Sequence, residues 1–99
     1  MTLPISFRRL ARQELDDAGD WYERERPGLG FEFFSEIERL LNLIAAAPQQ
    51  FPVVYRDLRK AVARRFPYCI YFREKPRRIV VLAVFHSARN PAVWQQRAK

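Results

Sequence analysis

The stretch YCIYFREKPRRIVVLAVFHSARNPAVWQQR, residues 68–97, decides the fold of this chain. It holds two apolar runs, residues 68–74 and 78–85, on either side of a turn that contains Pro76, and such runs are typical of β-strands. Because only a few residues connect them, we expect the two strands to pair antiparallel. Residues 60–66, KAVARRF, read as one more strand, so the second half of the chain predicts a three-stranded antiparallel meander.

The last of these strands is apolar on both faces. Strict alternation turns one set of residues one way (Ile79, Val81, Ala83, Phe85) and the other set the opposite way (Val80, Leu82, Val84, His86). A strand with two apolar faces is typical of a sheet that is covered on both sides. We therefore predict that this strand is central in the sheet, with the helices on one face and further cover on the other.

The first half of the chain has helical periodicity. Apolar residues recur at steps of three and four in two segments, residues 8–26 (Ala11, Leu15, Ala18, Tyr22) and residues 31–47 (Phe33, Ile37, Leu40, Ile44). The sequence RPGLG, residues 26–30, interrupts the pattern, so we expect two helices folded back as a hairpin. Before them, LPISF, residues 3–7, is a short strand candidate.

Together these elements predict an α+β protein, a small two-layer sandwich with an N-terminal strand, a helix hairpin, the meander and a short C-terminal helix. A length of 99 residues fits one domain, residues 1–99. The longest apolar run is too short to cross a bilayer, the first nine residues lack the order of a secretion signal, and the lone Cys69 cannot form an internal disulfide. We expect a cytoplasmic protein without metal or cofactor, with Cys69 as a small residue in or near the core.

The tail after the last strand reads as the start of a helix. Asn90 is a good N-cap and Pro91 suits the first helical position. Trp94 is expected to pack on the open face of the sheet, or alternatively to anchor a partner. His86 and Arg89 remain unexplained by this helix, and for His86 we expect a capping or surface hydrogen bond in place of catalysis.

The charge of the chain is strongly uneven. Residues 1–55 carry six arginines against nine carboxylates, residues 56–78 carry nine basic side chains against two acidic ones, and residues 79–99 add three basic and no acidic side chains. A basic second half indicates an anionic partner, either nucleic acid or an acidic polypeptide. The alternative is a set of solvated strand edges on which Lys and Arg discourage aggregation.

The order of elements, together with the segments RRFPYCIYFRE and VLAVFHSARNPAVWQQR, resembles the RelE/ParE family of bacterial toxins over essentially the whole chain. The resemblance implies a small α/β sandwich and the toxin half of a toxin–antitoxin pair. It also implies a partner, an acidic, ParD-like antitoxin whose partly disordered C-terminal region folds along the toxin. A basic toxin of this kind fits the uneven charge of the chain.

That family contains two activities. One branch cleaves messenger RNA on the ribosome with a cluster of Arg or Lys with Tyr, or of Glu, Arg, His and Tyr, and the other poisons DNA gyrase without a nuclease cluster. In the nuclease branch the strand that matches YCIYF usually carries an Arg after its first aromatic residue, where this chain has Cys69. The terminal catalytic Tyr is also replaced, because the only aromatic residue after Arg89 is Trp94. Both departures favour the gyrase branch, in which the toxin itself is not an enzyme.

The resemblance and the basic second half suggest two sets of site residues. A target-binding surface is predicted from basic and aromatic residues near the tail (Arg64, Arg65, His86, Arg89, Trp94, Arg97), and an antitoxin-binding set from the meander turn (Arg73, Arg77, Arg78). Arg64 and Arg65 are read as strand neighbours that face opposite ways. If the chain were instead a messenger-RNA endonuclease, its catalytic residues would be His86, Arg89 and Arg65.

A third hypothesis is a plain nucleic-acid-binding module whose basic strands follow phosphates. Tyr68, Tyr71 and Phe72 would then be stacking platforms for bases. These aromatic residues lie in a strand that must also build the core, so packing is their simpler explanation.

Overall fold

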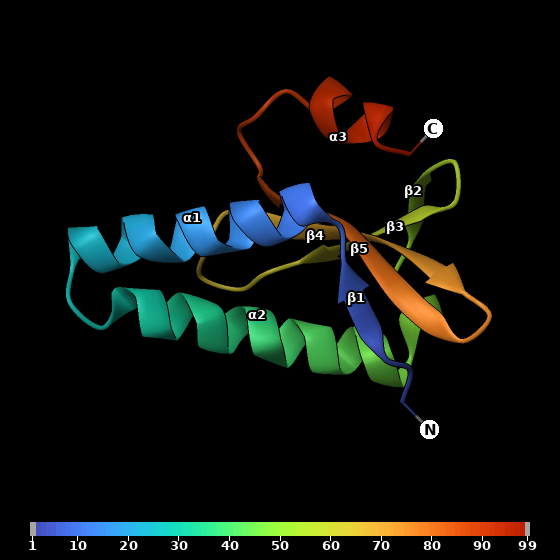
Figure 1. Cartoon of the computed structure of the whole chain (residues 1–99), viewed down its shortest axis with the longest axis horizontal. Helices are drawn as coiled ribbons and strands as arrows, with labels where there is room; N and C mark the ends of the chain where they lie inside the picture. Colours follow the sequence, from blue (N-terminus) through green and yellow to red (C-terminus); the bar gives the residue numbers. More distant parts are fainter. Residues whose placement is uncertain (1, 99) are drawn as a thin grey trace.

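The computed structural model describes residues 2–98 and shows one five-stranded sheet with helices on both sides (Figure 1). The strands lie in the order β1-β5-β4-β3-β2, in which β1 pairs parallel with β5 and all other neighbours are antiparallel. Along the chain the elements are β1 (Ile5–Phe7), α1 (Arg9–Glu25), α2 (Leu29–Ala46), the 3-10 turn η1 (Pro48–Gln50), β2 (Val53–Tyr55), β3 (Leu58–Val62), β4 (Tyr68–Lys75), β5 (Arg78–His86) and α3 (Ala92–Gln96).

The predicted α+β class is confirmed, with two changes in the strands. The meander has a fourth strand, β2, which is only three residues long and therefore leaves little periodicity in the sequence. β3 ends at Val62, earlier than predicted, so Arg64 and Arg65 lie in the connection to β4 and the prediction that they alternate on a strand is wrong. β5 is interior as expected, but the middle position of the sheet belongs to β4.

The helix hairpin depends on a turn at Gly28. This residue has a φ of 89°, in the left-handed region that glycine adopts without steric strain. The Glu23 carboxylate accepts hydrogen bonds from the backbone N–H groups of Gly28 (2.9 Å) and Gly30 (3.0 Å), which satisfies donors at the start of α2. α1 and α2 thus run antiparallel and side by side (Figure 1).

Each face of the sheet has its own apolar core. The hairpin face contains side chains from both long helices and from alternate strand positions, among them Phe33, Ile37, Ile70 and Phe72. On the opposite face a smaller cluster forms around Trp94 of α3, with Cys69, Tyr71 and Phe85 beneath it. The expectation that Trp94 covers the open face is confirmed. α3 begins one residue later than predicted, with Pro91 at the N-cap position, and Asn90 Oδ1 accepts a hydrogen bond from the N–H of its first residue, Ala92 (3.0 Å).

A β-bulge changes the faces of β5. Tyr71 pairs with Ala83 but Phe72 pairs with Val81, so β5 has one extra residue at this point. Ile79, Val81 and Val84 consequently belong to the hairpin face, while Ala83 and Phe85 belong to the α3 face. The predicted strict alternation along β5 therefore holds to Leu82 and is wrong from Ala83 onward.

Candidate functional site

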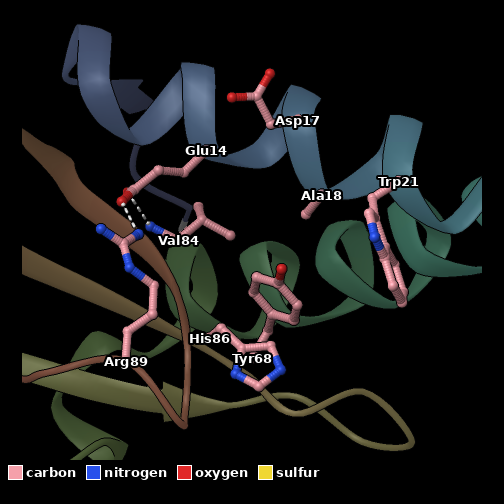
Figure 2. Close-up of a pocket in the computed structure, with 8 residues that line it drawn as sticks. All are labelled: Glu14, Asp17, Ala18, Trp21, Tyr68, Val84, His86 and Arg89. Atoms are coloured by element: carbon pink, nitrogen blue, oxygen red, sulfur yellow. Dashed lines mark hydrogen bonds and ion pairs between the residues drawn. The ribbon is translucent and has the colours of Figure 1, made fainter.

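A depression of about 270 Å³ lies between α1 and the ends of β4 and β5, and Figure 2 shows the side chains around it. Helix α1 contributes one wall and the two strands contribute the floor and the far rim. The lining residues are Glu14, Asp17, Ala18, Trp21, Tyr68, Val84, His86 and Arg89. Two predicted site residues, His86 and Arg89, thus lie together in one pocket.

The bulge in β5 is what brings His86 to this pocket. Without the extra residue, His86 would share a face with Val80 and Leu82, which pack under α3. With it, His86 follows Val84 to the hairpin side and lies opposite Tyr68 of β4, with the two rings edge to face at 5.2 Å. Bulges often redirect a side chain in this way beside functional sites.

Glu14 is the electrostatic centre of the region. Its Oε1 lies 2.8 Å from Arg97 Nη1 and accepts a hydrogen bond from Val84 N–H (3.1 Å), while its Oε2 accepts from Arg89 Nη1 (2.9 Å) and Arg97 Nη2 (3.0 Å). The Glu14 and Arg97 side chains are 13% and 17% exposed, so this pair is only weakly screened by solvent. Glu14 therefore fixes both arginines and ties α1 to β5 and the tail.

His86 accepts a hydrogen bond from the main chain. Its Nδ1 accepts a hydrogen bond from Ala88 N–H (3.0 Å), which confirms the expected local hydrogen bond. Because Nδ1 uses its lone pair here, the neutral ring carries its proton on Nε2. In this tautomer Nε2–H is a donor, and the Nδ1 lone pair already accepts the Ala88 N–H.

Tyr68 lies beside His86 with its hydroxyl directed toward α1 (Figure 2). Burial raises the pKa of Tyr68 above its ordinary value, with a smaller contribution from Tyr22. The phenol is therefore neutral at physiological pH and can donate a hydrogen bond, but it is a poorer proton donor than an ordinary tyrosine.

The structure places Trp94 and Cys69 away from this pocket. Trp94 is 5% exposed and stacks on Tyr71, with ring centroids 3.9 Å apart and an interplanar angle of 16°. Cys69 is buried in the same cluster, as predicted, and burial raises the pKa of its thiol. Tyr71 and Phe72 are also buried, so they pack in the core and are not stacking platforms for bases.

Arg64 and Arg65, in the connection between β3 and β4, contact carboxylates in the N-terminal half of α2. Arg65 Nη2 is 2.8 Å from Glu32 Oε1, and Arg64 N–H donates to the Glu36 carboxylate. The hydrogen bond from Arg65 lowers the pKa of Glu32, and the pKa of Glu36 is lowered mainly by its hydrogen bond with Arg39, with a smaller contribution from Arg64 N–H. Arg65 lines a separate depression with residues of α2, so the structure does not bring it together with His86 and Arg89.

The three residues of the predicted antitoxin set differ in their surroundings. Arg73 is largely buried: its Nε lies 2.8 Å from Asp57 Oδ2 and its Nη2 donates to the Ala98 carbonyl (2.9 Å). Arg77 and Arg78 are exposed at the turn between β4 and β5, where they border a shallow hollow with Lys75. Only these last two arginines are fully available to a partner.

Sequence reasoning missed Glu14, Tyr68 and Trp21 as pocket residues. Glu14 is one of many carboxylates in a helical stripe, and the arginines that it binds lie more than seventy positions away. Trp21 is 51% exposed beside the pocket, although a large aromatic residue in an amphipathic helix usually indicates core. One feature of the sequence could have pointed to Tyr68. It begins one predicted strand and His86 ends the next, and because a short turn joins these strands, the two residues are expected to lie opposite each other.

Among residues 2–98 no group of three or more His, Cys, Asp or Glu side chains is arranged to hold a metal ion. Within the same range, no helix is both long enough and apolar enough to span a membrane.

Residues 5–91 match the family model described as the ParE toxin of the type II toxin–antitoxin system parDE. This chain belongs to that family, in agreement with the resemblance seen in the sequence. A solved structure titled "Chromosomal ParDE TA system from P. aeruginosa" superimposes with a TM-score of 0.74 at 20% identity, covering 86% of this chain and 96% of that one. It confirms the fold. No curated protein sequence matches the chain.

Proposed function

We propose that this ParE-family toxin stops growth by poisoning DNA gyrase, and that a cognate acidic antitoxin neutralises it. The observation that carries the choice of target is the set of contacts in the pocket, in which Nδ1 of the only histidine accepts a hydrogen bond from Ala88 N–H and the Glu14 carboxylate is bound by Arg89 and Arg97. To take a proton from a ribose hydroxyl, either group would first have to give up these contacts, and the second carboxylate of the pocket, Asp17, is exposed and accepts a hydrogen bond from Gln13.

The residues that a nuclease would need are also dispersed. Arg65 borders a different depression from His86 and Arg89. The position that carries an arginine in the nuclease branch is Cys69, which points into the cluster under α3. These observations support inhibition by binding over catalysis.

The target-binding surface that we propose includes the exposed part of this region. Arg89 is 46% exposed, and its guanidinium lies 4.1 Å from the Phe85 ring centroid. Arg97 and Trp94 act indirectly, because both are largely buried and hold the tail in place. Arg64 and Arg65 are exposed beside α2, where Arg65 lines a separate depression, and would form a second part of the predicted surface.

The test of the target uses purified gyrase and supercoiled DNA. The toxin is expected to trap gyrase on cleaved DNA, Arg89→Ala is expected to weaken trapping, and His86→Ala is expected to retain most of it. Arg24→Ala, which removes an exposed arginine from the last turn of α1, is the matched control for charge.

The messenger-RNA alternative predicts the reverse. Primer extension on messages from cells that express the toxin would then show codon-dependent cuts, and these would vanish in both His86→Ala and Arg89→Ala. Such cuts, with no gyrase trapped on DNA, would rule out the proposed target.

For the antitoxin we propose an acidic segment that binds as a helix in a groove, with or without an added strand, and is steered by Arg77 and Arg78. Reversal of both charges (Arg77→Glu, Arg78→Glu) should slow association most at low salt. Arg73 is left unchanged in this variant because its reversal would break the ion pair with Asp57. Stopped-flow mixing with the acidic product of the adjacent reading frame measures the rate, and an unchanged rate would remove the steering role.

A further inference from the structure

A second hollow, of about 470 Å³, lies on the other side of Arg97 from the pocket of Glu14. Its lining consists of four arginines and two leucines: Arg8, Arg9, Leu10, Arg73, Leu82 and Arg97. No acidic side chain lines it. The residues come from the start of α1, from β4, from β5 and from the tail, so the fold assembles this cluster from distant parts of the chain.

Two of these arginines are built into the protein. Arg73 and Arg97 have side chains 13% and 17% exposed, and they are held by Asp57 and Glu14 and by the carbonyl oxygens of Ala98 and Leu82. Their guanidinium groups are thus oriented before any ligand arrives, which lowers the entropy lost on binding.

The other two arginines complete the hollow without serving the fold. Arg8 and Arg9 are exposed, and neither side chain is described in a hydrogen bond, ion pair or ring contact within residues 2–98. Arg8 is the N-cap residue and Arg9 the first residue of α1, a helix of 17 residues whose first turn has no acidic residue and no side-chain cap. The positive end of the α1 dipole therefore adds to the potential of Arg8 and Arg9, whereas the charges of Arg73 and Arg97 are paired with Asp57 and Glu14.

We propose that this arginine hollow binds the phosphodiester backbone of duplex DNA. Guanidinium groups bind phosphate oxygens in a bidentate manner, and helix N-termini are common phosphate contacts. The choice of DNA over another phosphate source rests on the proposed function, because gyrase holds DNA when it is trapped. An acidic peptide is the competing occupant, because the half-exposed Leu10 could contact its apolar side chains, and the test therefore includes one.

The test measures binding of a fluorescent short duplex DNA to the full chain by anisotropy over a series of salt concentrations. The variant is Arg8→Gln with Arg9→Gln, which leaves the interactions of Arg73 and Arg97 intact. Each lost phosphate contact lowers the slope of log affinity against log salt by about one, so the pair should lower it by about two. The matched control, Arg77→Gln with Arg78→Gln, removes the same charge from another exposed site and should retain the steeper slope.

An equal decrease of this slope in both double variants would mean that DNA binding depends only on the net charge of the protein, and would overturn the inference. So would an acidic peptide, such as polyglutamate, that binds with dependence on Arg8 and Arg9 while DNA does not. Gyrase trapping is measured on the same proteins. If the toxin still traps gyrase but does not bind DNA, the hollow is not a DNA site and the proposed function stands. If DNA binds through Arg8 and Arg9 but gyrase is not trapped, the DNA site stands and the proposed function is refuted.

Discussion

The two faces of the sheet are covered very differently. On one face α1 and α2, of 17 and 18 residues, pack over a continuous core that includes Phe33, Tyr22 and Phe66 in mutual ring contact. On the other face α3 has five residues, and its cover depends on Trp94 stacked on Tyr71. The hairpin face thus determines the fold, whereas the α3 face positions the arginines of the tail.

The largest expected effect is a difference in stability between substitutions in the two cores. Phe33→Ala removes a fully buried ring at the centre of the hairpin face and should lower the free energy of unfolding by about 3–5 kcal/mol. Trp94→Ala should cost less, because the short α3 can detach while the rest of the domain stays folded. Urea unfolding measures both losses, and hydrogen exchange should show faster exchange confined to the tail for Trp94→Ala. Equal losses, with exchange raised throughout, would contradict the distinction.

The next effect tests the link between α1 and the tail. Glu14→Gln leaves the partly buried Arg97 without its carboxylate and should lower the free energy of unfolding by about 1–3 kcal/mol. Asp17→Asn is the control, since Asp17 lines the same pocket but is exposed and accepts its hydrogen bond from Gln13. That control should change stability by less than about 0.5 kcal/mol. If both variants lose the same free energy of unfolding in urea, the contact between Glu14 of α1 and Arg97 of the tail does not stabilise the protein.

The smallest effect appears at high pH. Burial, with a smaller contribution from Cys69, raises the pKa of Tyr71 to about 12, from 10.0. Between these values the folded protein retains a proton that the unfolded chain has lost, so stability falls as pH rises, by at most about 1.4 kcal/mol per pH unit for this group. Tyr71→Phe should make unfolding less dependent on pH in this window. An identical pH dependence in both proteins would show that Tyr71 does not contribute.

Much of the fold could be predicted because its periodicities are local. The stripe of Ala11, Leu15 and Ala18 and the long apolar run of β5 are visible in neighbouring residues. The short β2 and the end of β3 at Val62 could not be located in this way, because three to five residues carry too little pattern.

The site could be predicted only in part, for a different reason. His86 and Arg89 were identifiable as polar residues at the end of an apolar strand. Their surroundings depend on the bulge between Val81 and Ala83 and on a carboxylate far away in the sequence, Glu14. An extra residue in a strand leaves no mark in an apolar run, since every residue around it is apolar, and so the side on which His86 emerges is decided by strand pairing.

The shortness of β1 has a consequence for contacts between molecules. β1 pairs with β5 only at residues 79–81, which leaves the following part of that edge without a neighbouring strand. There Arg97 binds the Leu82 carbonyl and Glu14 binds Val84 N–H, so the groups that would accept a foreign strand are occupied by side chains. The opposite border of the sheet, at β2, carries the exposed Val53 and Val54. Strand exchange or amyloid-like stacking between copies is therefore expected to begin at β2, and the border beside the tail is protected from it.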